Sequence, residues 1–208
     1  MSEPNARARI LVWSDYVCPY CYLIERDLDR LREQYADKLI IDYRAFELRP
    51  APHATLEPRG DYLLTAWSRS VYPLAERYGM PINLPSVQPH SSLAFQMTEY
   101  ARGQGRTLET HMALFRAFFV DDRDIGELSE LLEIANELGL DTEELQRHLQ
   151  TGTYKAEVDR QRVEGLERQI SGVPAMFVEP VEEGAFPVSG VTGVDINGVE
   201  HLLRTHVG

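Results

Sequence analysis

Both cysteines of this 208-residue chain lie in one short motif, Cys-Pro-Tyr-Cys at 18–21. Two thiols at this spacing can form and break a disulfide, so the motif indicates redox chemistry. The apolar run at 10–13 predicts a buried strand before the motif, and the pattern of 19–35 predicts a helix that begins inside it. Pro19 suits the first helical position, because its fixed φ matches a helix and its missing N–H would have no partner there.

Cys18 is therefore expected at the helix N-terminus, where unpaired N–H groups and the positive end of the helix dipole favour a thiolate. Cys21 follows on the same helical face, within reach of Cys18 but shielded from other partners. We expect Cys18 to attack a substrate disulfide and Cys21 to resolve the mixed disulfide. Pro19 and Tyr20 lie between the two thiols and are expected to set the balance between dithiol and disulfide.

Two other interpretations of the cysteine pair remain open. Two cysteines separated by two residues also form half of many zinc sites, but the remaining ligands would have to come from residues such as His201 and His206, far along the chain. A purely structural disulfide is the second alternative. A chain of this length can bury a large core without one. We therefore predict a redox dithiol and no metal site.

The overall charge restricts the class of partner. The chain carries 21 basic and 33 acidic residues, a formal charge of −12, which argues against nucleic acid or anionic lipid as the main partner. No apolar stretch reads as a secretory signal or a bilayer span. We expect a cytoplasmic protein, and in that compartment a lone cysteine pair is more often catalytic or redox-sensing than structural.

The order of predicted elements divides the chain into an α/β part and a helical part. Residues 1–60 and 152–208 are expected to form one discontinuous α/β domain, and 61–151 a helical insertion that packs as a cap. In the α/β part we expect strands at 10–13, 39–46 and 176–178, a hairpin partner at 187–188, and helices at 19–35, 153–169 and 195–206. In the insertion we expect helices at 61–78, 91–101, 108–119 and 127–138, and a short helix opened by a capping box at 141–144.

Four stretches of the sequence resemble the DsbA-like branch of the thioredoxin superfamily, and most closely its FrnE-type proteins. The stretches are Ser-Asp-Tyr-Val-Cys-Pro-Tyr-Cys-Tyr at 14–22, Phe-Glu-Leu-Arg-Pro at 46–50, Leu-Phe-Arg-Ala-Phe-Phe at 114–119 with Asp-Ile at 124–125, and Ser-Gly-Val-Pro at 171–174. The resemblance implies a thioredoxin-like fold, with a central mixed sheet and a helical insertion domain that overhangs the dithiol.

The same resemblance implies a role for the Gly-Val-Pro segment. Pro174 is expected to be cis and to face Cys18, although a trans proline that starts a strand is the ordinary alternative. The backbone of Val173 would then lie beside the sulfurs, where an extended substrate segment can pair with it. The sequence departs from the family pattern at His90-Ser91, at Ala94-Phe95 and at 191–193, so a family substrate preference does not carry over.

Some further polar and apolar residues have both functional and ordinary interpretations. Asp15, three residues before Cys18, could accept or relay a thiol proton, or could be a solvated or capping residue. Glu25, four residues after Cys21, could tune the buried thiol or simply be exposed. We interpret His53, His111 and His148 as surface or helix-face residues. Five residues of the insertion are expected in its core: Met97, Met112, Phe115, Phe118 and Phe119.

The function predicted from the sequence is thiol–disulfide exchange, as a reductase or isomerase of protein disulfides. The substrates would be protein or small-thiol disulfides, with a reducing or oxidising recycling partner, and glutathione is a candidate co-substrate; no other cofactor is expected. A kappa-like glutathione transferase or chromene-carboxylate isomerase is one alternative, although those proteins use serine where Cys18 stands. A redox-sensing or chaperone-like binding module is the other.

Overall fold

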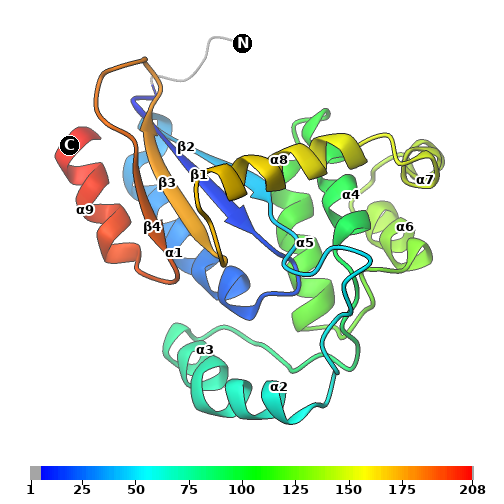
Figure 1. Ribbon diagram of the computed structural model, residues 1–208. Helices are drawn as coiled ribbons and strands as arrows, with labels where there is room; N and C mark the ends of the chain where they lie inside the picture. Colours follow the sequence, from blue (N-terminus) through cyan, green and yellow to red (C-terminus); the bar gives the residue numbers. More distant parts are fainter. Residues whose placement is uncertain (1–5, 208) are drawn as a thin grey trace.

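The structure is a computed structural model that describes residues 6–207. A mixed sheet of four strands lies at its centre (Figure 1). The strands are β1 (Ala8–Ser14), β2 (Leu39–Ala45), β3 (Ala175–Pro180) and β4 (Ser189–Thr192), in the order β2-β1-β3-β4. β1 is parallel to β2, and the pairs β1–β3 and β3–β4 are antiparallel. This is the thioredoxin-like α/β arrangement expected from the sequence.

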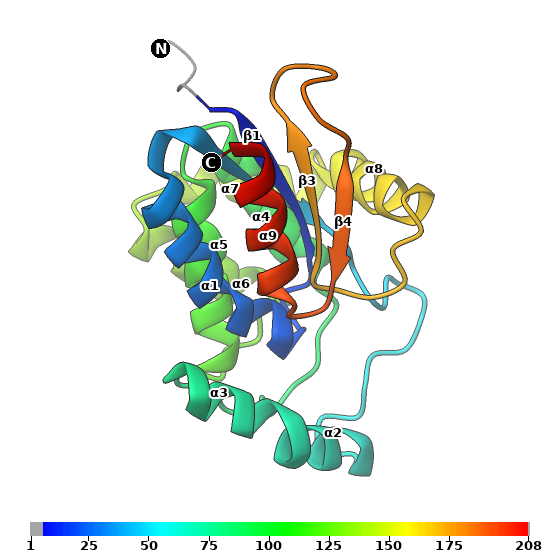
Figure 2. The ribbon, with the colours of Figure 1, turned by 90° about the vertical axis from the view of Figure 1, so that its left-hand side faces the viewer.

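Two helices cover one face of the sheet. They are α1 (Pro19–Tyr35) and α9 (Ile196–Val207), which lie side by side in Figure 2. The alternate residues Ile10 and Val12 of β1 point to this face and pack with the apolar stripe of α1. The stripe consists of the residues that the helical period selects: Ile24, Leu28, Leu31 and Tyr35, all buried. A 3₁₀ turn, η1 (Ala36–Lys38), joins α1 to β2.

The helix α8 (Lys155–Glu167) packs against the opposite face. Trp13 of β1 points to that face and donates its indole N–H to the carbonyl of Gln161 at 2.8 Å. Gly165 allows the close approach, because a Cβ there would lie 2.9 Å from both Phe46 Cδ2 and Trp13 Nε1. The helix was expected to run over 153–169. It is two residues shorter at each end.

The segment between β2 and α8 forms the helical insertion. It contains α2 (Asp61–Ala66), the π-helical turn η2 (Trp67–Val71), α3 (Tyr72–Tyr78), α4 (Ser92–Arg102), α5 (Thr107–Phe119), α6 (Leu128–Glu137) and α7 (Thr142–Thr151). The single helix expected at 61–78 has the right extent but contains the π turn. Asp141 caps α7 as the motif predicts, since its carboxylate accepts from the Glu144 N–H at 2.9 Å. No helix within 6–207 has the length and apolarity needed to cross a membrane.

The core of the insertion is continuous with the segment that carries the cysteines. Phe115, Phe118 and Phe119 of α5 are fully buried, and they belong to the same apolar cluster as Tyr16 and Cys21. The hairpin was expected at 187–188 but its second strand begins at residue 189. Pro187 has no N–H to donate to a ladder, which explains why pairing begins after it.

Candidate active site

Cys18 lies at the N-cap of α1, as predicted from Pro19 at the first helical position. Its backbone is extended, with φ −95° and ψ 112°, and its carbonyl accepts from the Cys21 N–H at 3.0 Å. The Cys18 thiol donates to the carbonyl of Val173 at 3.5 Å. The residue is 5% exposed. The exposed part of the side chain borders an open pocket.

Cys21 lies behind Cys18 and is completely buried. The two sulfurs are unbonded, and the Cys18 side chain hydrogen bonds to Cys21. Burial raises the pKa of the Cys21 thiol, and the hydrogen bond and charge of Cys18 raise it further. The Asp15 backbone and the Ser14 side chain act in the opposite direction and lower this pKa. Cys21 therefore holds its proton more tightly than an exposed thiol does.

The loop before β3 approaches the dithiol from the other side. The Val173–Pro174 peptide bond is cis, as the family resemblance implied. The carbonyl of Val173 faces the Cys18 sulfur, and the carbonyl of Pro174 accepts from the Gly193 N–H at 2.8 Å. Gly193, which follows β4 and belongs to the stretch where the sequence departs from the family pattern, thus holds this loop in place.

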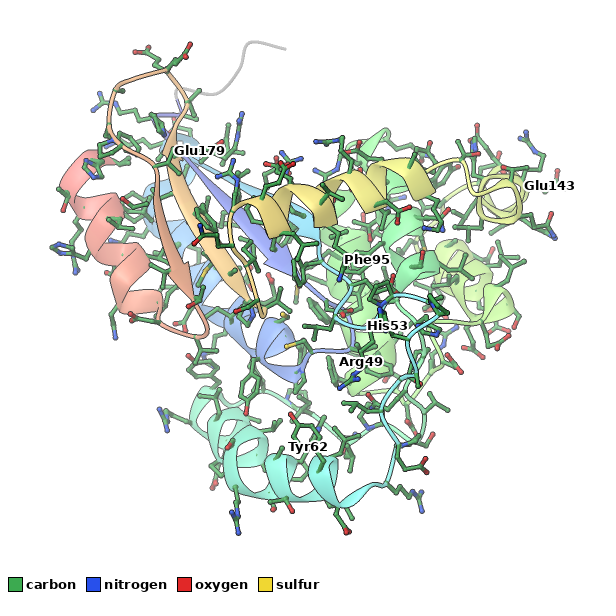
Figure 3. The ribbon with its side chains drawn as sticks, viewed as in Figure 1. Arg49, His53, Tyr62, Phe95, Glu143 and Glu179 are labelled. Atoms are coloured by element: carbon green, nitrogen blue, oxygen red, sulfur yellow. The ribbon has the colours of Figure 1, made fainter. Side chains whose placement is uncertain are left out.

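An apolar pocket of about 230 Å³ opens beside Cys18. One wall consists of Pro19 and Tyr20 at the start of α1, and another of Gly172 and Val173. The segment α2–η2 closes the far side, where Tyr62 is 70% exposed (Figure 3). The other residues that line the pocket are Val17, Leu48, Leu56, Leu63, Ala66, Trp67, Val71 and Gln88. This far wall has no local signal in the sequence, because its residues lie more than 40 positions after the motif.

Asp15 is fully buried, and among the hydrogen bonds of the described residues its carboxylate makes none to a sulfur. The carboxylate accepts from the N–H groups of Leu48 at 2.7 Å and Val17 at 3.3 Å, so it ties the loop before α1 to the segment after β2. Burial raises its pKa. Asp15 lines a small cavity of about 50 Å³. Glu47, which the sequence analysis did not single out, also lines this cavity. Burial and the nearby charge of Asp15 raise the pKa of Glu47.

Glu25 lies on α1, four residues after Cys21, and is also buried. Its carboxylate accepts from the Tyr43 hydroxyl at 2.5 Å and lies 3.2 Å from Nε2 of His111 and 3.4 Å from Arg32. Among the hydrogen bonds of the described residues, none joins Glu25 to Cys21. His111 was expected to be an ordinary surface or helix-face residue. It is 2% exposed and lies in a polar network instead.

The family comparison decides how this geometry is classified. Residues 9–196 match the model of the DSBA-like thioredoxin domain. The chain belongs to this family. The match includes both cysteines, the helical insertion and the cis-proline loop, so the DsbA-like resemblance found in the sequence is confirmed. Its FrnE-type refinement stays a prediction.

Two curated relatives from Bacillus subtilis (strain 168) cover most of this DsbA-like chain. The uncharacterized protein YwbO is 33% identical over 195 residues, which is 90% of this chain and 92% of YwbO. The ClpXP adapter protein SpxH is 25% identical over 222 residues, which is 99% of this chain and 70% of SpxH.

Three solved structures share the fold. A 2-hydroxychromene-2-carboxylate isomerase superposes with a TM-score of 0.76 at 20% identity, covering 96% of this chain and 98% of that one. A probable DsbA oxidoreductase from Streptomyces coelicolor has a TM-score of 0.74 at 20% identity, covering 95% and 89%. The cytosolic disulfide reductase DsbM from Pseudomonas aeruginosa, solved with GSH, has a TM-score of 0.69 at 18% identity, covering 96% and 98%.

Proposed function

We propose that this DsbA-like protein is a thiol–disulfide oxidoreductase that reduces or isomerises disulfides through Cys18 and Cys21. The observation that carries the proposal is the arrangement of the two sulfurs. One lies at a helix N-cap beside an open apolar pocket, and the other lies buried behind it within hydrogen-bonding distance. This asymmetry supports an attacking role for Cys18 and a resolving role for Cys21.

The exchange proceeds in two steps. The Cys18 thiolate attacks one sulfur of a substrate disulfide, a mixed disulfide forms, and the other substrate sulfur leaves as a thiolate that takes up a proton. Cys21 then loses its proton and attacks the Cys18 sulfur, which releases the second substrate thiol and leaves a Cys18–Cys21 disulfide. The substrate gains two electrons and two protons, and the enzyme loses them. The reverse sequence oxidises a dithiol.

The burial of Cys21 next to Cys18 explains why Cys21 attacks second. Cys18 raises the pKa of the Cys21 thiol through its charge and hydrogen bond. Formation of the mixed disulfide removes that charge, so Cys21 loses its proton more readily at the moment when it must attack. In this scheme Val173 and Pro174 bind an extended substrate segment, and Pro19 and Tyr20 set the redox balance. The buried carboxylates of Asp15 and Glu25 hold the segments around the dithiol in position.

Replacement of each cysteine tests these roles. A Cys18→Ser variant should lose insulin reduction, and a Cys21→Ser variant should accumulate a mixed disulfide that migrates as a covalent adduct on a non-reducing gel. The double variant is the matched control for non-covalent adducts. Full insulin reduction by Cys18→Ser would show that the mechanism is wrong.

The pocket and the related proteins suggest the substrates. Apolar side chains dominate the pocket, which suits a protein disulfide flanked by apolar residues or a small apolar disulfide. We propose glutathione as the small-thiol co-substrate, since a similar fold, DsbM, was solved with GSH. A recycling partner would restore the dithiol. DsbM is described as cytosolic, and a cytoplasmic location would favour reduction or isomerisation here. Titration of the dithiol against glutathione gives the potential and hence the direction.

Two other functions have specific support. The similarity to a chromene-carboxylate isomerase favours glutathione-dependent isomerisation or transfer. An assay that conjugates glutathione to a chromogenic acceptor separates this possibility from exchange. The similarity to the adapter SpxH favours a binding module. Equal client binding by the wild type and by the double cysteine variant would support that role.

A further inference from the structure

A chain of buried hydrogen bonds joins the loop before Cys18 to the helical insertion. The hydroxyl of Tyr16 lies 2.6 Å from Oγ1 of Thr98 and 3.0 Å from Nδ1 of His111. Nε2 of His111 lies 3.2 Å from a carboxylate oxygen of Glu25. All four residues are at most 4% exposed. The chain therefore runs through protein interior from α4 and α5 to α1, and it includes a residue two positions before the attacking cysteine.

Each hydroxyl in this chain has one proton to donate. Thr98 donates its proton to the carbonyl of Ala94 at 3.1 Å, so its oxygen accepts from Tyr16. Burial raises the pKa of Tyr16, so the phenol keeps its proton and donates it to Thr98. The phenol oxygen then remains as an acceptor for His111. This requires a proton on Nδ1 of His111.

The opposite nitrogen of His111 also needs a proton. Burial raises the pKa of Tyr43, and its hydroxyl donates to one oxygen of Glu25. The other oxygen of Glu25 faces Nε2 of His111. One proton must therefore lie between these two atoms, which form a charge-assisted hydrogen bond.

The surroundings of His111 suit a positively charged ring. The His111 ring stacks on Tyr43, with ring centroids 3.9 Å apart and an interplanar angle of 30°. Glu25 and Arg32 of α1 and Tyr43 of β2 face this end of the network. The charged residues that line the small cavity on the remaining side are Arg44, Glu99 and Arg102. Each of the three guanidinium groups has a carboxylate partner: Glu25 pairs with Arg32, Glu99 with Arg102, and Asp42 with Arg44.

We propose that His111 carries protons on both ring nitrogens and acts as a positioning residue for Cys18, holding the Tyr16 loop to the insertion; this rests on the exchange function proposed above. His111 touches no reacting atom. It holds Tyr16 from α5 of the helical insertion, while α1, which packs on the sheet, holds Cys18. The helical insertion thus sets the position of the attacking sulfur relative to the pocket, in addition to forming the pocket wall.

Nitrogen-15 NMR of the imidazole rings tests the protonation of His111 without any activity measurement. The His111 signals are assigned by their loss in a His111→Gln variant. We expect protons on both Nδ1 and Nε2 of His111 in the reduced wild type at neutral pH, and Tyr16→Phe should shift the Nδ1 signal because it removes the acceptor. A bare nitrogen at either position in the wild type would overturn the inference while leaving the exchange function intact.

Kinetics with a matched control test the positioning role. Tyr16→Phe keeps the ring contacts with Phe95 and Phe115 but removes the hydroxyl. Tyr22→Phe removes a hydroxyl from the same interface, where Tyr22 stacks on Phe119 outside the chain of hydrogen bonds. We expect kcat/KM for disulfide reduction to fall about tenfold in Tyr16→Phe, the size of one lost charge-assisted bond. It should change less than twofold in Tyr22→Phe.

Stability measurements on the same variants separate positioning from general destabilisation. If Tyr16→Phe and Tyr22→Phe lower the melting temperature equally and only the first slows exchange, the positioning role is supported. If Tyr16→Phe exchanges disulfides within twofold of the wild type, His111 does not position Cys18. Loss of exchange by Cys18→Ser tests the function itself, so failure of the inference and failure of the function give different results.

Discussion

The two sides of the dithiol are built differently, although both come from the helical insertion. On one side, α4 and α5 bury most of their side chains, including Phe118 and the polar chain through His111. On the other side, the arm α2–η2–α3 buries Trp67 and Val71 but exposes Tyr62 and Leu64. The pocket beside Cys18 is lined by residues of this arm, among them Tyr62, which is labelled in Figure 3.

This contrast separates two tasks. The α4–α5 side has dense packing and a continuous chain of buried hydrogen bonds, which hold a reactive group in one geometry. The arm has exposed apolar side chains and a wall that a substrate can contact, which are features of a binding surface. We therefore expect substitutions on the α4–α5 side to change stability, and substitutions on the arm to change substrate recognition.

The largest expected effect is on the α4–α5 side. Phe118→Ala should lower the free energy of unfolding by about 3–5 kcal/mol, because it leaves a cavity in a fully buried cluster. Tyr62→Ala on the arm should change it by less than about 0.5 kcal/mol. Urea unfolding of both variants measures the difference. Equal losses would remove the distinction between the two sides.

A smaller loss is expected where α8 meets the sheet. Gly165→Ala should cost about 1–3 kcal/mol, since the new Cβ would lie 2.9 Å from atoms of Phe46 and Trp13. Gly172→Ala is the matched control, because no heavy atom lies within 4 Å of a Cβ there. Urea midpoints compare the two. A stable Gly165→Ala protein would show that α8 can move away from the sheet.

On the arm, the expected effect is on catalysis rather than stability. Tyr62→Ala should raise KM for an apolar peptide disulfide roughly threefold, because it removes an aromatic wall of the pocket. Leu64→Ala removes an exposed apolar side chain from the same helix outside the pocket lining, and should leave KM unchanged. Steady-state reduction assays measure both. If the two variants raise KM equally, the pocket is not the binding surface.

The smallest effect concerns the buried carboxyl group of Glu47. Burial raises its pKa above the unfolded value, so the folded state binds a proton more tightly and loses stability as the pH rises through the raised pKa. Glu47→Gln should therefore gain stability relative to the wild type as the pH rises from the ordinary glutamate range to neutral. Unfolding curves across that range measure the difference. A constant difference would show that Glu47 titrates normally.

The sequence predicted the dithiol side of the site much better than its surroundings. Cys18 and Pro19 carry local signals for a helix start, and the stripe on 19–35 predicts which face of that helix is buried. His111 could not be placed in this way, because its partners Tyr16 and Glu25 lie 95 and 86 residues away. Tyr62 also lacks a local signal, since its role depends on how the arm folds back over the motif.

The π turn at 67–71 explains how the arm keeps one face on the pocket. The buried residues of the arm recur at every fourth position: Leu63, Trp67, Val71 and Ala75. In a regular α-helix, a step of four residues advances about 40° beyond a full circle, so three steps would rotate the last side chain by roughly 120°. The wider turn takes up this excess rotation. Deletion of one residue inside the turn would twist the far end of the arm away from Cys18 and leave its near end in place.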